Sequence, residues 1–479
     1  MRAFADEARK ALKRQAGHTV RSHLRAPRGF GRSGSAGIRP TLLPDEIKIS
    51  ARRFDRLVFP DGFKWGVAVA GAQTEGHDVS SNWARFLARK HGKGHVARAE
   101  AVDFWHRFTE DIARAEKSGA NLFRFSVEWG RIEPRPGVID RAALARYVKM
   151  VDRINKSGME PLVTLHHFSH PGWLDETAGG WQVGKARLGG RSGWERADMP
   201  DRFAAFTETV ATALKGKVKR WITINEPNVE PIAGYGVGFF PPGKKNPLAV
   251  GRVVENITRA HVKAYDVLHR IDPTAEVSSN VFRMEMDIRG KLQAAPGLID
   301  PAHRMLQRWT RWQDRPGGPV RNTLDFLSFD YYYALKPTEL SKAMPAYNWP
   351  VRPEGLYQAL KEYHQKFGLP LLIAENGLAS YRGGPRPDGW TREAYLVNHL
   401  VQVKRAIDDG VPVKGYTHWT LTDNYEWGSF DPTFGLYAID RAGGALKRRA
   451  TPALEIFKRI TGSNSLPADL LARYAGRRS

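Results

Sequence analysis

The stretch LLIAENG, residues 371–377, is an apolar run that ends in a carboxylate and then in a turn-forming Asn-Gly pair. Consecutive aliphatic side chains without polar alternation are typical of a parallel strand that is covered on both faces. Barrels of the α/β class place their chemistry at the carboxyl ends of such strands, which makes Glu375 a candidate catalytic group. Taken alone, the stretch is more typical of a capped strand end with a solvated Glu375.

A second stretch of the same design lies earlier in the chain. RWITINEP, residues 220–227, is again an apolar strand that ends in a carboxylate, here Glu226. Cleavage of a glycosidic bond requires two carboxyl groups, one as the proton donor and one as the nucleophile or base. Two strand-end carboxylates, Glu226 and Glu375, therefore favour a catalytic interpretation of both stretches.

At these two stretches the chain resembles glycoside hydrolase family 1, the β-glucosidase and β-glycosidase family. Its two signatures stand here as Asn225-Glu226-Pro227 and Glu375-Asn376-Gly377, and further matching motifs run from Phe59 to about residue 460. The resemblance implies a single (β/α)8 TIM barrel and a retaining exo-β-glycosidase that hydrolyses terminal β-linked sugars. It also implies Glu226 as the acid/base, Glu375 as the nucleophile, and neither a cofactor nor a metal.

Three residues are expected to support the catalytic pair. Strand alternation points Arg124 into the mouth of the barrel, which is costly for a buried cation unless a carboxylate meets it. The resemblance makes Arg124 the partner of the nucleophile, Tyr332 a hydrogen-bond donor to it, and Asn225 a support residue that also contacts the sugar. Asp330 stands where the family carries Asn, so a third carboxyl group is expected near the pair.

The resemblance also assigns a set of sugar-binding side chains. They comprise a ring platform, hydrogen-bonding groups for the terminal sugar and an aromatic residue at the pocket edge: Gln73, His167, Asn225, Trp419, Glu426, Trp427 and Phe434. Members that act on phosphorylated sugars usually carry a small residue at the Glu426 position. A carboxylate there would repel a phosphate, so an unphosphorylated sugar is expected.

Two adjacent histidines, His166 and His167, end the strand predicted over residues 161–168. Paired histidines are common zinc ligands, but no matching spacing of Asp, Glu or His follows them, so we expect no metal here. The resemblance gives His167 a sugar hydroxyl as its partner and leaves His166 as a packing residue.

Composition bounds the domain organisation. The 479 residues suffice for one barrel with insertions, and the absence of cysteine excludes a disulfide framework, a thiolate metal site and a thiol nucleophile. No apolar run approaches the ~20 residues that span a bilayer. We expect a basic, flexible extension over residues 1–55, the barrel over residues 56–460, and a basic tail over residues 461–479.

The net charge of +24 is unusual, and the first forty residues carry ten Lys and Arg against Asp6 and Glu7. Such a surface attracts anionic partners, or it is a soluble surface rich in Arg. A disordered basic tail, a membrane-surface helix and a transit-peptide-like segment all fit residues 1–40. The extension lacks the apolar core of a secretory signal, so we expect a cytoplasmic protein, with peripheral contact to an anionic membrane as one option. No nucleic-acid recognition motif is present.

Two other functions remain open at this point. A glycosyltransferase acting on glycolipid would use the same two carboxylates, with an alcohol acceptor in place of water. A non-catalytic sugar-binding relative is the other alternative, although such a protein would normally have lost one carboxylate. The identity of the sugar and of the leaving group, and the oligomeric state, cannot be read from the sequence.

Overall fold

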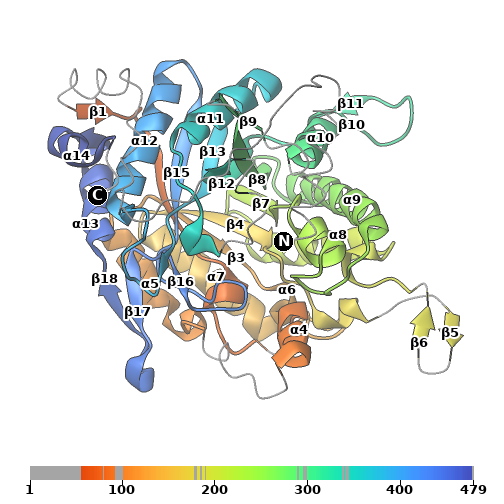
Figure 1. Cartoon of the computed structure of the whole chain (residues 1–479). Helices are drawn as coiled ribbons and strands as arrows, with labels where there is room; N and C mark the ends of the chain where they lie inside the picture. The colour runs from red at the N-terminus through yellow and green to blue at the C-terminus, as the bar shows by residue number, and fades with distance from the viewer. Residues whose placement is uncertain are drawn as a thin grey trace, which may run out of the picture.

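The computed structural model describes residues 56–476, apart from 79, 92–100, 177–180, 184–185, 189, 289–290, 295–298, 337–338 and 340–344. Residues 1–55 lie outside the described part, and with them the predicted basic extension and its proposed membrane contact. Figure 1 shows one body in which helices surround a central set of strands. Within the described residues, no helix combines the length and the apolar character needed to cross a membrane.

The predicted (β/α)8 barrel is confirmed. Each of its parallel strands pairs with the next one in chain order, including the fifth with the sixth, and the eighth pairs with the first, which closes the ring. The barrel strands are β2 (Lys64–Ala68), β3 (Leu122–Ser126), β4 (Glu160–His166), β7 (Arg220–Asn225), β8 (Glu276–Ile288), β12 (Leu327–Leu335), β13 (Leu371–Asn376) and β15 (Val413–Trp419). The order of these strands brings all their carboxyl ends to one face.

The helices cover the outside of this ring (Figure 1). They are α3 (Gly71–Thr74), α4 (Asn82–His91), α5 (Phe104–Lys117), α6 (Trp129–Ile132), α7 (Arg141–Lys156), α8 (Met199–Ala213), α9 (Pro247–Ile271), α10 (Ile299–Thr310), α11 (Glu354–Phe367), α12 (Arg392–Asp408), α13 (Pro452–Ser463) and α14 (Ala468–Tyr474). Short strands complete the chain: β1 (Arg56–Val58), β5 (Trp181–Val183), β6 (Ala186–Leu188), β9 (Lys291–Ala294), β10 (Trp312–Gln313), β11 (Val320–Arg321), β14 (Ser380–Tyr381), β16 (Pro432–Thr433), β17 (Tyr437–Asp440), β18 (Lys447–Ala450) and β19 (Ser465–Pro467).

Alternation along the strands divides the apolar side chains into two cores. One set meets inside the barrel and includes Leu122, Ile222 and Leu372, all nearly inaccessible to solvent. The other set points outward and packs against the helices in one large cluster. Because both faces of each strand are covered, the strands read as unbroken apolar runs, which is why LLIAENG has no polar alternation.

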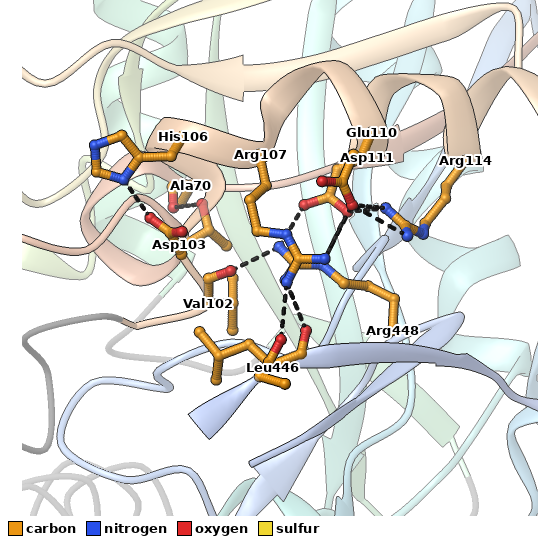
Figure 2. Close-up of polar contacts among 12 residues, drawn as sticks. Ala70, Val102, Asp103, His106, Arg107, Glu110, Asp111, Arg114, Leu446 and Arg448 are labelled. Atoms are coloured by element: carbon orange, nitrogen blue, oxygen red, sulfur yellow. Dashed lines mark hydrogen bonds and ion pairs between the residues drawn. The ribbon is translucent and has the colours of Figure 1, made fainter. Parts of the chain in front are cut away.

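A buried ion-pair group fastens the β17–β18 hairpin to α5 (Figure 2). Arg448 on β18 donates to both carboxylate oxygens of Asp111, at 3.0 and 2.7 Å, and Arg114 donates to one of them at 3.0 Å. The Asp111 and Arg448 side chains are both fully buried. Arg448 also donates to the carbonyl oxygens of Val102 and Leu446, so four of its five N–H groups have a partner.

The C-terminal segment differs from the prediction. Residues 461–476, expected to form part of a basic tail, belong to the folded body. β19 pairs antiparallel with β1, and α14 buries Leu470, Leu471 and Tyr474. The three arginines of residues 461–479 suggested a solvated tail, but the short apolar stripe between them is long enough for two helical turns and drives packing.

Candidate active site

Both predicted catalytic carboxylates lie at the carboxyl-terminal face of the barrel. Glu375 is the fifth residue of β13, and Glu226 follows the last residue of β7. Glu226 adopts a left-handed backbone conformation with φ of 39°, which is strained for a residue with a side chain. Its N–H donates to the Asn280 carbonyl oxygen at 2.7 Å, which holds the turn in place. Glu226 is 9% exposed and Glu375 is 3% exposed.

Glu375 is held by two of the predicted support residues. The Tyr332 hydroxyl donates to Glu375 Oε2 at 2.6 Å, and Arg124 Nη1 forms an ion pair with Oε1. Arg124 is fully buried on β3, and its guanidinium also donates to Thr164 Oγ1 at 3.2 Å and to Asn225 Oδ1 at 2.6 Å. These contacts fix the planar guanidinium in one orientation, so the nucleophile position is held on two sides.

Asp330 points into the site, as the resemblance suggested. One carboxylate oxygen from each of Glu226, Asp330 and Glu375 lies within 4.8 Å of the others. Register places Asp330 of β12 opposite Glu375 of β13, so neighbouring strands deliver the two groups side by side.

Asn280 is a site residue that sequence reasoning missed. Its side-chain amide, on β8, donates to Asn225 Oδ1 at 2.8 Å and also to Asp330. It therefore links β7 to β12 beneath the catalytic pair. The available signal was its place after Val277 and two serines, where a short strand-like run ends in an amide side chain.

The three carboxyl groups differ in their electrostatics. Burial and then the Glu375 carboxylate raise the pKa of Glu226 well above its usual value, against the opposing effect of Arg124. Burial also raises the pKa of Glu375, but Arg124, with Tyr332, opposes that shift. Burial and Glu375 raise the pKa of Asp330 well above its usual range. Glu375 is therefore the group that ionises first, next to the fixed cation.

The predicted sugar-binding residues form one wall beside this pair. Gln73, on α3, donates to Glu426 Oε2 at 2.9 Å. Burial and the nearby Glu375 carboxylate raise the pKa of Glu426 to about 8. The His167 ring stacks between two indoles, with ring centroids 5.8 Å from Trp419 and 5.9 Å from Trp427.

Phe434 is buried, with its ring centroid 6.0 Å from that of Tyr332, so it borders the nucleophile side of the site. Two polar atoms of the site residues, Gln73 Oε1 and Asn225 Nδ2, are buried and have no hydrogen-bond partner among the described residues. Buried polar groups normally find partners, and sugar hydroxyls would supply both a donor and an acceptor here. The geometry thus brings together every site residue that the sequence predicted.

Three groups of side chains within the described residues could hold a metal ion. One is the catalytic group of Glu226, Asp330 and Glu375, whose charge Arg124 already balances in part. A second lies at the surface and consists of His77, Asp103 and His106, with His106 Nδ1 2.6 Å from Asp103 (Figure 2). The third is buried and contains His166, which the sequence had assigned to packing.

The family model described as glycosyl hydrolase family 1 matches residues 56–316 and 334–466, which is most of the chain. A β-galactosidase of Sulfolobus acidocaldarius is 28% identical to this chain, and the match covers 86% of this chain and 97% of that protein. β-Glucosidase A of Thermotoga maritima is 29% identical, and the match covers 80% of this chain and 93% of that protein.

A solved structure with the same architecture is the β-glycosidase from Pyrococcus horikoshii. It is 29% identical, covers 88% of this chain and 98% of its own, and superposes with a TM-score of 0.72. These relatives favour neither of the alternatives kept open above, the glycolipid transferase and the non-catalytic sugar-binding protein.

Proposed function

Because the chain belongs to glycosyl hydrolase family 1 and is a retaining β-glycosidase, we propose that Glu226 is its acid/base and Glu375 its nucleophile. The observation that carries the assignment is the asymmetry between the two groups. Glu375 has a buried cation and a hydroxyl donor on its carboxylate, whereas burial and the charge of Glu375 both favour the protonated form of Glu226. Environments that push two carboxyl pKa values apart define the acid and the base of a pair.

The reaction follows from this arrangement. A Glu375 carboxylate oxygen bonds to the anomeric carbon while the bond to the leaving oxygen breaks and Glu226 gives that oxygen its proton. The glycosyl–Glu375 ester then reacts with water. Glu226 takes the proton of the water, the new bond forms at the anomeric carbon, and the ester bond breaks. In retaining enzymes the carboxyl groups lie about 5–5.5 Å apart, and the observed limit of 4.8 Å between their oxygens supports this course.

We further propose that the substrate carries an unphosphorylated hexose at its non-reducing end. Glu426 lies opposite Gln73 in the sugar-binding wall, where the two can share neighbouring hydroxyl groups. Its side chain is buried and shares the site with Glu375, so a sugar phosphate would meet the Glu375 charge with little solvent screening and would find no cation at the Glu426 position. Two of the curated relatives are named as β-galactosidase and β-glucosidase, which supports galactose and glucose as the first sugars to test, while another is named as a 6-phospho-β-glucosidase and makes the phosphorylated sugar the necessary comparison.

Hydrolysis of a panel of p-nitrophenyl glycosides tests this proposal. The panel contains β-glucoside, β-galactoside, β-fucoside, β-mannoside, α-glucoside and 6-phospho-β-glucoside. We expect the highest kcat/KM on an unphosphorylated β-glycoside and a value at least about 100-fold lower on the 6-phospho compound, equivalent to about 2.7 kcal/mol of discrimination. A preference for the 6-phospho compound would overturn the assignment of the Glu426 position, and activity on the α-glucoside alone would overturn the assignment of the catalytic pair.

A further inference from the structure

A group of buried ionisable side chains lies behind the sugar-binding wall and takes no part in the proposed reaction. His166 is the last residue of β4, His170 follows in the next loop, and Glu230 precedes the helical turn η4 (Pro231–Gly236). One ligand atom from each of the three lies within 4.8 Å of the others. His166 Nε2 is 2.7 Å from Glu230 Oε2. All three are at most 1% exposed.

A second carboxylate, Asp175, completes the group. Its Oδ1 lies 3.0 Å from His170 Nε2, while the other ring nitrogen of His170 faces the Asn82 amide at 3.3 Å. Two nearly inaccessible carboxylates are costly to bury unless cations compensate them. Two atoms of the group, His166 Nδ1 and Asp175 Oδ2, are also buried without a hydrogen-bond partner among the described residues.

We propose that His166, His170 and Glu230 bind a divalent transition-metal ion of the zinc class. Two imidazoles and one carboxylate are a common zinc donor set, and tetrahedral bonds of 2.0–2.2 Å place neighbouring donors about 3.3–3.5 Å apart. The three ligand atoms already lie within 4.8 Å of one another, so small side-chain shifts would bring them to that spacing without a change of fold. The ion also balances the buried charge of Glu230.

Asp175 acts as the positioning residue for His170. Histidines that bind metals usually give their second ring N–H to a carboxylate, which fixes the ring and makes the first nitrogen a better ligand. Because Asp175 occupies Nε2 of His170, Nδ1, which now lies 3.3 Å from the Asn82 amide, is the nitrogen left for the ion.

The site would join two segments that carry active-site residues. His166 precedes the sugar-binding His167, and alternation along β4 sends the two rings to opposite sides of the strand. Glu230 closes the turn that begins at Glu226, where the Val229 N–H donates to the Glu226 carbonyl oxygen at 2.8 Å. The ion would therefore brace the strained backbone of the acid/base, without contact to the substrate.

Metal binding to the full-length protein tests the proposal. The protein is treated with EDTA, dialysed into metal-free buffer and titrated with ZnCl2 by calorimetry, and bound metal is then measured by elemental mass spectrometry. We expect about one tight equivalent per chain and a higher Tm with Zn²⁺ than with EDTA. Co²⁺ should bind in its place and show the visible absorption of a four-coordinate ion without thiolate ligands, because the chain has no cysteine.

Two variants identify the site. Glu230→Gln keeps the shape of the side chain but removes the anionic ligand, and it should lose the tight equivalent and the Zn²⁺-dependent rise in Tm. Asp175→Asn should weaken Zn²⁺ binding by about 10–100-fold, as loss of a carboxylate behind a ligand histidine does. The matched control is His77→Ala/His106→Ala, which removes the exposed cluster and should bind Zn²⁺ as the wild type does.

Three results would overturn the proposal. The first is a wild-type chain that binds no tight Zn²⁺, which would leave two ion-free His–carboxylate pairs. The second is loss of the tight equivalent in His77→Ala/His106→Ala, which would place the ion at the surface. The third is a folded Glu230→Gln variant that binds Zn²⁺ unchanged. The first two results need no substitution in the buried group, so they hold even if Glu230→Gln does not fold.

Discussion

The side-chain amide of Asn280 on β8 donates a hydrogen bond to Asp330 on β12, and so keeps a third carboxyl group beside the catalytic pair. The same amide donates to Asn225, which in turn accepts from Arg124, the cation that holds Glu375. A continuous chain of polar contacts therefore connects Asp330 to the nucleophile through side chains on β8, β7 and β3. Protonation of one end changes the electrostatics at the other.

Asp330→Asn should shift the pH–rate profile to lower pH. The pKa of Asp330 is raised well above its usual value by burial and by Glu375, so Asp330 stays protonated while Glu375 ionises and gains its charge only as the pH rises further. That late charge raises the pKa of Glu226. Its removal should lower the alkaline limb of kcat/KM by on the order of one pH unit and the acidic limb by less. An unchanged alkaline limb would mean that Asp330 stays neutral throughout.

Glu375→Gln should lower kcat by at least about 10⁴-fold, because the amide cannot form the glycosyl–enzyme bond. Tyr332→Phe serves as the matched variant. It leaves the nucleophile in place and removes one hydrogen bond to a charged group, so its loss should be about 10–100-fold. The measurement is kcat on an activated aryl glycoside. A Glu375→Gln loss no larger than that of Tyr332→Phe would contradict the nucleophile assignment.

Glu226→Ala should retain activity on aryl glycosides with good leaving groups, which need no proton, and lose about 10²–10⁴-fold on poor ones. Azide should accelerate the variant, because it replaces the water that Glu226 would activate. The small anion attacks the glycosyl–Glu375 bond from the face that the leaving group vacated, so the product should be the β-glycosyl azide.

The anomeric configuration of that azide, read by NMR, decides the stereochemistry. An α-glycosyl azide from Glu226→Ala, or an initial α-sugar from the wild type, would contradict the retaining course. Glu375→Ala is the matched control, since azide can fill the vacated nucleophile site there and give the inverted product.

Asp111→Asn should lower the free energy of unfolding by about 3–5 kcal/mol, because it leaves the fully buried Arg448 cation without its charged partner. Urea denaturation followed by tryptophan fluorescence measures the change. Glu110→Gln is the control on the same helix, because the Glu110 side chain is half exposed in its pairs with Arg107 and Arg114 (Figure 2). Its effect should stay within about 1 kcal/mol. Equal losses in the two variants would argue against the special role of the buried pair.

Much of the barrel and of the site could be predicted because their signals are local. Glu226 and Glu375 each stand at the carboxyl end of a strand that is buried apart from the half-buried Arg220, and the family motifs identify the sugar-binding residues directly. Asn280 could not be assigned a role in that way. Its contacts depend on the register between β8 and its two neighbours, which no short stretch of sequence encodes.

The grouping of His166 with Glu230, on which the proposed metal site rests, escaped prediction for a related reason. Glu230 lies far along the chain from His166, and only the closed ring of strands brings the two together. In the C-terminal segment, net charge did not predict the structure, because α14 packs through the buried side chains of Leu470, Leu471 and Tyr474.

The pairing of β1 with β19 has a consequence for how the chain is made. Val58 pairs with Ser465, so the backbone groups of β1, the first described strand, form their ladder hydrogen bonds only when β19 is in place. During synthesis on the ribosome, β1 stays unpaired among the described strands until β19 has emerged, and Figure 1 shows β1 beside α14, the helix that follows β19. Cooperative closure of the folded body is therefore tied to the emergence of residues 465–467, and chains truncated before residue 465 should remain open to proteases at their N-terminal strand.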